Sequence, residues 1–167
     1  NCDLKICDYG LARLKYEDEE DRDVHICPMT EYVCTRWYRA PDVLCAMPNY
    51  GKQIDVWSVG CIFAEMLKRK PIFPGKNTQH TLQMIIGVLG TPRAETLNRI
   101  PNQKCRQFIE SLPACGGQSL AEAVPNASRD ALDLLNKTLR FDSTDRITVE
   151  QALQQRYLHQ LYCPEDE

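Results

Sequence analysis

Apolar residues occupy most positions from 54 to 67 of the chain. A stretch of this length is too long for an ordinary strand and too short to span a membrane, so it predicts a helix buried at the centre of a domain. The basic residues at 68–70, followed by Pro71, predict the end of that helix. Asp55 lies in its first turn, where an acid either complements the helix dipole or holds a neighbouring loop by hydrogen bonds.

A second helix is predicted directly after the first. Residues 82–89 carry leucine or isoleucine at i, i+3, i+4 and i+7, which is the spacing of one apolar helix face. Gly90 and Pro92 then predict its end. Residues 92–125 show only weak periodicity and carry several prolines and glycines, so we expect a loop-rich insertion with one short helix.

The two ends of the chain add shorter elements. Ser128 is placed to cap a helix that presents leucines at positions 132, 135 and 139 on one face. Thr148 and Gln151 have the spacing of a capping box and predict a last helix through Leu158. Residues 4–7 predict a short strand that stops at Gly10. The pattern as a whole indicates a mainly α fold.

Composition narrows the class of protein. The chain has 167 residues, 43% of them hydrophobic, and a net charge of −3, which fits one domain with a substantial core. Its charge predicts no general attraction to nucleic acid or to an anionic membrane, and no apolar run is long enough to span a bilayer. The chain starts at Asn1 without a methionine or an apolar signal segment, so we expect a piece of a longer protein.

The nine cysteines do not resemble a disulfide framework, because their number is odd and no C-x-x-C pair occurs. Only His25 and Cys27 lie close enough together to resemble half of a zinc site, and no second pair of ligands is near them. The better interpretation is a set of reduced thiols, most of them buried, in a protein of the cytoplasm and nucleus.

Residues 29–42 place phosphorylatable hydroxyls beside arginines. Thr30 and Tyr32 stand a few positions before Arg36 and Arg39. A phosphate would add about −1.5 to −2 charges and strong acceptor oxygens, which the planar guanidinium groups fit in bidentate fashion. The segment therefore indicates a charge-operated switch. The acidic run at 17–23 indicates a solvated loop or, alternatively, acids that compete with phosphate for the arginines.

Four motifs in the same order resemble the C-terminal lobe of a eukaryotic protein kinase, and they cover almost the whole chain. D-Y-G at 8–10 is similar to the family's D-F-G, and A-P-D at 40–42 is similar to A-P-E. D-V-W-S-V-G-C at 55–61 resembles the central helix of that lobe, and D-R-I at 145–147 resembles the arginine-bearing turn before the last helix. The implied fold is mainly α, a fragment of the two-lobed α+β kinase fold.

Further residues narrow the resemblance to the mitogen-activated protein (MAP) kinases of the extracellular-signal-regulated type. T-E-Y at 30–32 resembles their dual-phosphorylation motif, and W-Y-R at 37–39 and P-I-F-P-G at 71–75 are also similar to that family. The insertion at 92–125 fits the extra segment of these kinases.

The resemblance divides the chain into consecutive parts of one kinase domain. Residues 1–42 hold the D-Y-G motif, the activation segment and the substrate loop. Residues 43–91 hold the central helix and the helix after it, and residues 92–125 are the insertion. Residues 126–162 form the C-terminal helices, and residues 163–167 form an acidic docking tail.

The resemblance assigns the metal and nucleotide site to the first motif. Asp8 corresponds to the acid that holds Mg²⁺ against the phosphates of ATP, and Cys7 lines the nucleotide pocket. ATP and Mg²⁺ are thus the expected cofactors of the intact protein. Tyr9 replaces the usual phenylalanine and brings a hydroxyl that needs a partner if it is buried.

The resemblance also assigns the regulatory residues. Thr30 and Tyr32 are the implied phosphorylation sites. Arg13 would bind phosphorylated Thr30, and Arg36 and Arg39 would bind phosphorylated Tyr32.

Substrate binding is implied for Val33, Thr35, Arg36, Trp37 and Arg39. The family's pocket here accepts the proline that follows the substrate serine or threonine. Proline has no backbone N–H, so such a pocket need not satisfy that donor.

Asp42, Arg146 and Asp55 have implied structural roles, and we expect Asp42 and Arg146 to form a buried ion pair. Removing one partner of such a pair typically costs about 3–5 kcal/mol. The family usually has glutamate at position 42, so the shorter aspartate predicts a looser pair or a displaced loop.

Docking is expected at the C-terminus. Glu165, Asp166 and Glu167 lie where the family keeps an acidic patch that binds basic peptides, although Cys163 occupies a position that is commonly aspartate. T-Q at 78–79 stands where the family often has the apolar residues of a second docking site, so that site is not expected.

The chain itself carries no catalytic base. It has no Gly-rich phosphate loop, no V-A-I-K lysine and no H-R-D-x-x-x-x-N loop, so the catalytic residues are expected upstream. We expect this chain alone to be inactive. We also expect it to be unstable, with Trp57 and Phe63 uncovered because their covering helices are missing.

The expected function of the parent is that of a proline-directed Ser/Thr kinase that transfers the γ-phosphate of ATP. An upstream dual-specificity MAP kinase kinase would activate it. The other expected partners are phosphatases, basic docking peptides and proline-containing protein substrates. Neither nucleic acid nor a membrane is an expected partner. A non-catalytic pseudokinase scaffold and a cyclin-dependent-kinase-like enzyme are the alternatives. Retention of Asp8 disfavours the scaffold, and Tyr32 with the insertion disfavours the second alternative.

Overall fold

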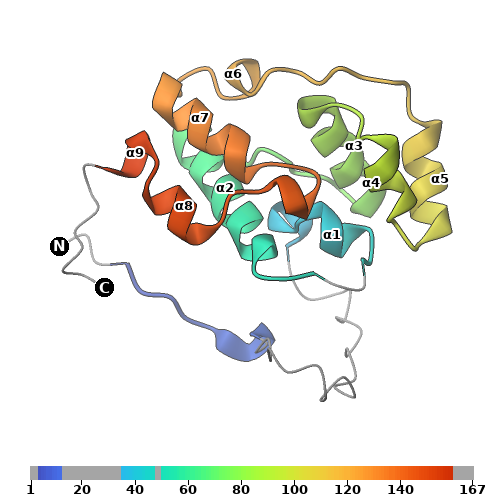
Figure 1. The fold of residues 1–167 in the computed structure, drawn as a ribbon, viewed down its shortest axis with the longest axis horizontal. Helices are drawn as coiled ribbons and strands as arrows, with labels where there is room; N and C mark the ends of the chain where they lie inside the picture. The colour runs from blue at the N-terminus through green and yellow to red at the C-terminus, as the bar shows by residue number, and fades with distance from the viewer. Residues whose placement is uncertain (1–3, 13–34, 48–49, 160–167) are drawn as a thin grey trace. The chain divides into compact units, whose positions relative to one another are not determined.

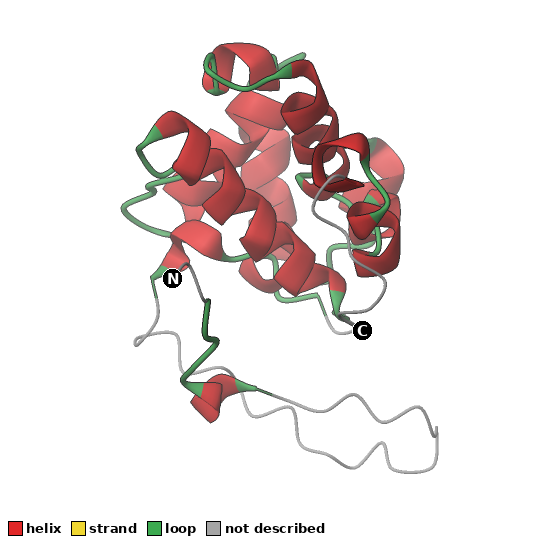
Figure 2. Cartoon of the chain, turned by 90° about the vertical axis from the view of Figure 1, so that its left-hand side faces the viewer, coloured by secondary structure: helices red, strands yellow, loops and turns green. Residues whose placement is uncertain are grey.

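The computed structural model describes residues 4–12, 35–47 and 50–159, which belong to two units divided between Val33 and Cys34. The described residues form helices and no strand (Figure 2), which confirms the predicted mainly α class. The α-helices are α1 Pro41–Leu44, α2 Gln53–Lys68, α3 Thr78–Leu89, α4 Ala94–Asn98, α5 Gln103–Ser111, α6 Leu120–Ala123, α7 Arg129–Thr138, α8 Val149–Leu153 and α9 Arg156–His159. The short 3₁₀ helices are η1 Tyr9–Leu11, η3 Arg36–Tyr38 and η4 Ser143–Asp145.

The described part of the first unit is an exposed segment that leads into η1. The strand predicted at 4–7 is not formed, and the side chains of Leu4 and Ile6 are 90% and 76% exposed. A strand needs a neighbouring strand to pair its backbone N–H and C=O groups, and no described residue supplies one. The strand prediction is therefore wrong for this structure.

Helix α2 forms the centre of the second unit. It packs against α7, which lies along it in Figure 1, and against η3. Arg69 ends the helix in the left-handed conformation (φ 64°), and its N–H donates to the carbonyl of Glu65 at 2.6 Å. The predicted end at 68–70 is confirmed.

Only one side of α2 is buried. Val56, Trp57, Gly60, Cys61 and Ala64 face the core. Val59, Ile62 and Met66, by contrast, are 62%, 50% and 65% exposed. Their spacing of i, i+3 and i+7 places them on one face of the helix, and no described element covers that face. The prediction of a helix buried at the centre of a domain is therefore right for one face of α2 and wrong for the other.

The predicted exposure of Trp57 is wrong. Trp57 is fully buried and its ring stacks on Phe73 with ring centroids 5.7 Å apart. Phe63 is half-buried and packs against Tyr157 of α9 at 4.9 Å. Elements within the chain therefore cover both aromatic rings.

The buried residues of helix α3 are those of the predicted apolar stripe. Leu82, Ile85 and Ile86 are buried, and the side chain of Asn77 caps the first turn by accepting a hydrogen bond from the His80 N–H at 2.8 Å. Gly90 ends the helix with φ 90°, as predicted, and its N–H donates to the carbonyl of Ile86.

The insertion holds more helix than the sequence analysis predicts. Residues 92–125 contain α4, α5 and α6 instead of one short helix. Side chains of Asn102 and Ser119 cap the last two of these. Helix α5 also has a stripe at i, i+3, i+4 and i+7, formed by Cys105, Phe108, Ile109 and the following Leu112, which all pack on the core. This apolar stripe is the sequence pattern that indicates α5 and that the sequence analysis did not recognise.

The insertion is held against the end of α3. The Gln118 N–H donates to the carbonyl of Gly87 at 2.7 Å, and the Thr91 N–H donates to that of Cys115 at 2.8 Å. A side chain at Gly117 would lie 2.6 Å from the backbone nitrogen of Gly90, and Gly117 itself has φ 82°. Only glycine fits there.

The C-terminal helices begin where predicted. The Ser128 hydroxyl accepts from the Ala131 N–H at 3.2 Å, and Thr148 and Gln151 form the reciprocal capping box. The predicted last helix does not run unbroken to Leu158, because the chain turns at 154–155 between α8 and α9.

Candidate functional site

Residues 35–42, which we call the recognition segment, hold most of the predicted substrate-binding positions. Thr35 is exposed, Arg36 to Tyr38 form η3, and Pro41 begins α1. The Trp37 indole N–H donates to the carbonyl of Gly75 at 3.2 Å, and the Ser58 hydroxyl donates to the carbonyl of Tyr38 at 2.9 Å. These bonds hold η3 on α2 and on the turn before α3.

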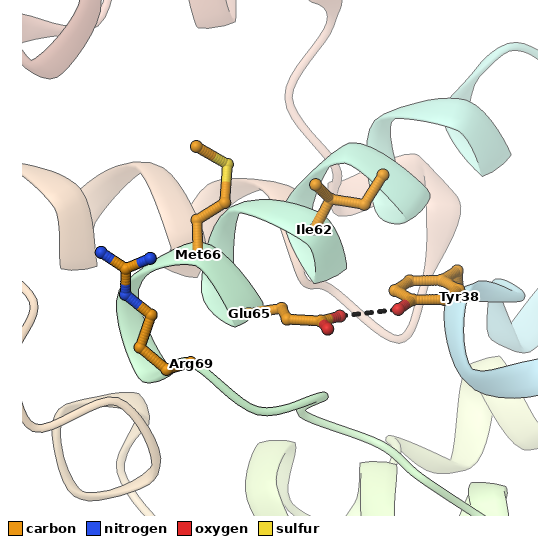
Figure 3. A pocket seen from close by; sticks show the side chains of 5 residues that line it. All are labelled: Tyr38, Ile62, Glu65, Met66 and Arg69. Atoms are coloured by element: carbon orange, nitrogen blue, oxygen red, sulfur yellow. Dashed lines mark hydrogen bonds between the residues drawn. The ribbon is translucent and has the colours of Figure 1, made fainter.

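Tyr38 adds a bond to the exposed side of α2. Its hydroxyl donates to a carboxylate oxygen of Glu65 at 2.6 Å, as Figure 3 shows. This bond, with burial, raises the pKa of Tyr38. Tyr38 and Glu65 line an open hollow together with Ile62, Met66 and Arg69. The hollow therefore combines one hydrogen-bonded polar pair with apolar side chains and one cation.

The turn that receives Trp37 depends on a close backbone contact. A Cβ atom at Gly75 would lie 2.1 Å from the hydroxyl oxygen of Thr81 and 2.6 Å from its backbone nitrogen. Glycine at this position lets the turn pack on the first turn of α3. The P-I-F-P-G motif at 71–75 therefore has a structural reason in this chain.

The recognition segment ends in the predicted buried ion pair. A guanidinium nitrogen of Arg146 contacts a carboxylate oxygen of Asp42, and the two side chains are 0% and 2% exposed. The shorter aspartate still reaches the arginine, so the predicted looser pair is not observed. A buried pair of this kind is costly to break, because the remaining charge is left without a partner.

Arg146 binds three carbonyl groups as well as Asp42. Its Nε–H donates to Arg140 at 2.8 Å, and its terminal N–H groups donate to Gln53 at 3.1 Å and Phe141 at 3.0 Å. The guanidinium carbon also lies 5.2 Å from the ring centroid of Trp57. Burial lowers the pKa of Arg146, and the charge of Asp42 opposes that shift. One side chain thus joins α1, α2 and the turn before α8.

A second, less buried acid lies in the same turn. Asp142 accepts hydrogen bonds from the Thr96 hydroxyl at 2.8 Å and from the Thr144 hydroxyl at 2.8 Å, and Arg99 contacts it. Burial opposes ionisation, but these hydrogen bonds and the charge of Arg99 outweigh it and lower the pKa of Asp142. The contacts of Asp142 therefore join the turn to the insertion.

Three other predicted residues of this unit are placed without their predicted contacts. Arg36 and Arg39 are half-buried, and Arg39 takes part in further interactions. Asp55 is exposed in the first turn of α2, where its backbone N–H donates to the carbonyl of Lys52 at 3.1 Å and its side chain has no hydrogen bond to a described residue. Phosphate binding by Arg36 and Arg39 and the loop-holding role of Asp55 remain predictions.

The D-Y-G motif has an unusual backbone. Asp8 lies in the left-handed region with φ 63° and ψ 68°, a conformation that costs a non-glycine residue on the order of 1–3 kcal/mol and is often found at functional sites. Tyr9 is 68% exposed and its hydroxyl donates to the carbonyl of Ile6 at 3.1 Å, so it does have a partner. The Cys7 thiol is free and exposed.

These features fit a magnesium ligand. The exposed carboxylate of Asp8 is the hard oxygen ligand that Mg²⁺ prefers, and Mg²⁺ commonly takes one or two carboxylates with water and phosphate oxygens. Asp8 would hold the ion, and Cys7 would lie beside the nucleotide. Bound Mg²⁺ would neutralise phosphate charge during phosphoryl transfer.

Several predicted site residues lie outside the described residues. They are the phosphorylation sites Thr30 and Tyr32, the phosphate-binding Arg13, the substrate-binding Val33, and the docking residues Glu165, Asp166 and Glu167. Their roles remain predictions.

The structure adds contacts that the sequence analysis did not assign. Gly75, Glu65 and Ser58 hold the recognition segment, and Thr96 and Arg99 bind Asp142. Each of these contacts joins segments at least 20 positions apart, so no local pattern could have revealed them. The aromatic partners Trp37 and Tyr38 did stand out in the sequence.

Comparison with known proteins places these features in a family. A family model described as protein kinase domain matches residues 1–158. Mitogen-activated protein kinase 2 of Pneumocystis carinii is 48% identical over 167 residues, which are 100% of this chain and 46% of that protein.

Plant proteins are similar to the same degree. Mitogen-activated protein kinase 3 of Oryza sativa subsp. japonica is 52% identical over 162 residues, 97% of this chain and 42% of that protein. Mitogen-activated protein kinase 2 of Arabidopsis thaliana is 51% identical over 164 residues, 98% of this chain and 42% of that protein. The chain therefore spans less than half the length of these curated relatives.

Proposed function

The chain belongs to the protein kinase family, and from that premise we propose that the intact protein is a Ser/Thr kinase of the MAP kinase type. It transfers the γ-phosphate of ATP to a serine or threonine that precedes proline. The observation that carries the proposal is the recognition segment, which Asp42 and Arg146 fix through a fully buried ion pair. A rigid backbone at this point can present a defined surface to a peptide.

In this proposal, the intact protein binds the metal ion and the nucleotide through residues of the first unit. Asp8 holds Mg²⁺ and Cys7 lines the nucleotide site, which the strained backbone at Asp8 supports. The base that accepts the substrate proton lies in a part of the protein outside this chain. Residues 1–167 alone are therefore inactive.

Regulation acts on the residues before the recognition segment. A dual-specificity MAP kinase kinase phosphorylates Thr30 and Tyr32, and phosphatases reverse that step. Arg13 binds the first phosphate, and Arg36 and Arg39 bind the second. The acidic C-terminal residues Glu165, Asp166 and Glu167 dock basic peptides. The protein works in the cytoplasm and nucleus.

The experiment compares two peptide substrates of the intact protein that differ only in proline or alanine after the serine. After treatment with an active MAP kinase kinase, we expect transfer to the proline peptide to be faster by at least about tenfold. The variant with Thr30→Ala and Tyr32→Phe is the control and stays at the unphosphorylated rate. Equal rates on the two peptides would contradict proline-directed binding.

Asp8→Asn separates catalysis from folding. The substitution removes the charged metal ligand and changes no residue of the second unit. We therefore expect phosphate transfer to be lost, while the second unit keeps the unfolding temperature of the parent. A folded intact protein that binds basic docking peptides but transfers no phosphate in any phosphorylation state would instead be a scaffold.

A further inference from the structure

The turn between α3 and α4 carries the one serine or threonine of this chain that a proline follows. The sequence has ten prolines, and among the residues that directly precede them only Thr91 has a hydroxyl group. A kinase that selects serine or threonine before proline therefore meets a single candidate in residues 1–167, the pair Thr91 and Pro92.

Thr91 is exposed and lies outside the helices. It directly follows Gly90, where α3 ends, and α4 begins only at Ala94. Exposed residues between helices are the ones that a modifying enzyme can reach. Three other threonines of the second unit, by contrast, are buried within helices: Thr81, Thr96 and Thr138.

The contacts of Thr91 leave its hydroxyl proton free within the described part of the chain. The hydroxyl oxygen accepts a hydrogen bond from the Cys115 N–H at 2.8 Å, and the Thr91 N–H donates to the carbonyl of Cys115 at 2.8 Å. The hydroxyl donates to no described residue. Both bonds lie where water can replace a lost partner, so opening them costs little.

Thr91 lines an open cavity together with two arginines. The cavity has a volume of about 650 Å³, and Arg93 and Arg140 contribute to its wall. Both arginines are exposed. A phosphate on Thr91 would add about −1.5 to −2 charges and three strong acceptor oxygens, which guanidinium groups bind well.

The acids of the same cavity leave Arg93 available. Asp142 already contacts Arg99, so its charge is compensated. Asp145 pairs with Arg93, but both side chains are about half exposed and such a pair is weak. A phosphate dianion carries more charge than one carboxylate, so a phosphate on Thr91 should take Arg93 from Asp145.

We propose that Thr91 is a phosphorylation site and that a second, active copy of the intact protein phosphorylates it. The Thr91 oxygen attacks the γ-phosphorus of ATP held by that copy, and the bond from the γ-phosphorus to the bridging oxygen of ADP breaks. The hydroxyl proton passes to the catalytic base of the same copy, so the products are phosphothreonine and ADP. Arg93 and Arg140 then bind the phosphate. This inference rests on the proposed proline-directed kinase activity.

The length of α3 explains why a second copy is needed. Helix α3 has 12 residues and is therefore about 18 Å long. Trp37 binds the carbonyl of Gly75 before the start of α3, whereas Thr91 follows its end. Both belong to one folded unit. A molecule cannot place Thr91 on its own recognition segment unless α3 unfolds.

The experiment uses the isotope-labelled intact Asp8→Asn protein as the substrate, because this variant should not phosphorylate itself. It is mixed with ATP, the serine–proline peptide and the unlabelled parent that an active MAP kinase kinase has phosphorylated. Mass spectrometry should find phosphate on Thr91 of the labelled protein. Transfer to the peptide without phosphate on Thr91 would overturn the inference and leave the proposed function standing.

Transfer to neither substrate would contradict the proposed function and the role of a second copy. A proline-directed kinase of known activity then tests the site on the same labelled protein. Phosphate on Thr91 from that kinase would support the site, and an unmodified Thr91 would overturn it.

Pro92→Ala in the labelled protein tests the proline requirement, because it keeps the threonine and both arginines. Phosphate incorporation at Thr91 should become slower by at least about tenfold. Pro101→Ala is the matched control, since Pro101 is an exposed proline that follows an isoleucine, and its rate should stay within about twofold of the parent. Equal rates in Pro92→Ala and the parent would overturn proline-directed modification of Thr91.

A phosphorus NMR titration of the Thr91-phosphorylated protein tests where the phosphate is bound. The second pKa of a phosphate ester is ordinarily about 6, and a bound arginine lowers it because the cation favours the dianion. Arg93→Ala should therefore raise this pKa towards about 6. Arg129→Ala is the control, because this exposed arginine lies outside the cavity. The same phosphate pKa in the parent, Arg93→Ala and Arg140→Ala would overturn binding by the two arginines.

Discussion

Asp145 and Arg146 are neighbours in the sequence, yet they take part in very different ion pairs. Arg146 and Asp42 are 0% and 2% exposed, and the arginine is also bound to three carbonyl groups. Asp145 pairs with Arg93 at 2.5 Å, but these side chains are 47% and 64% exposed. Water screens the second pair, whereas the first has no alternative partner when it is broken. Equal charge and short distance therefore do not imply equal stabilisation.

The two ion pairs also connect different parts of the second unit. The buried pair joins the end of the recognition segment to the turn before α8 and to the start of α2. The exposed pair joins the start of α4 to that turn at the surface. Only loss of the buried pair should release the recognition segment.

The largest expected effect is that of Arg146→Ala in the intact protein. It leaves Asp42 buried without a partner and frees three carbonyl groups, so we expect the free energy of unfolding to fall by about 3–5 kcal/mol. Thermal and denaturant unfolding measure it. Arg140→Ala is the control, since that nearby side chain is exposed. A melting temperature within about one degree of the parent would refute the anchoring role.

An intermediate effect is expected from Asp142→Asn. Asp142 is 8% exposed and its hydrogen bonds are charge-assisted, so their weakening should cost about 1.5–3 kcal/mol near neutral pH. The pKa of Asp142 is lowered in the folded protein. Its stabilisation is therefore complete above the ordinary carboxyl pKa of about 3.9 and is lost as the pH falls through the lower folded value.

Denaturant unfolding of parent and Asp142→Asn across pH tests the sign of that shift. The difference in free energy of unfolding should be constant near neutrality and shrink below about pH 4. A difference that grows in acid would mean that the folded protein raises this pKa.

The smallest expected effect is that of Arg93→Ala. The exposed pair with Asp145 should contribute at most about 1 kcal/mol, and less at high salt, because both side chains remain hydrated. Unfolding at low and high salt measures it. A loss as large as that of Arg146→Ala would show that exposure does not distinguish the two pairs.

Local pattern predicted much of the helical framework. The stripe at 82–89, the cap at Ser128 and the capping box at Thr148 are all found in the structure. The buried Asp42–Arg146 pair was predicted from resemblance, because no local rule connects residues 104 positions apart. Periodicity alone also did not reveal that α2 is covered on one face only, since both faces are apolar.

The missed features depend on tertiary contacts. Residues 4–7 have the composition of a strand but no described pairing partner, and Trp57 is covered by Phe73 and by Arg146 from other parts of the chain. Such contacts are set by packing and are not encoded in any single segment.

A double-mutant cycle at Arg146 and Asp42, measured by denaturant unfolding of the intact protein, tests the central claim that this pair anchors the recognition segment. Arg146→Ala, Asp42→Ala and the double variant should give a coupling energy of at least about 1.5 kcal/mol. The parallel cycle at Arg93 and Asp145 should give less than about 1 kcal/mol. Equal coupling in the two cycles would contradict the account.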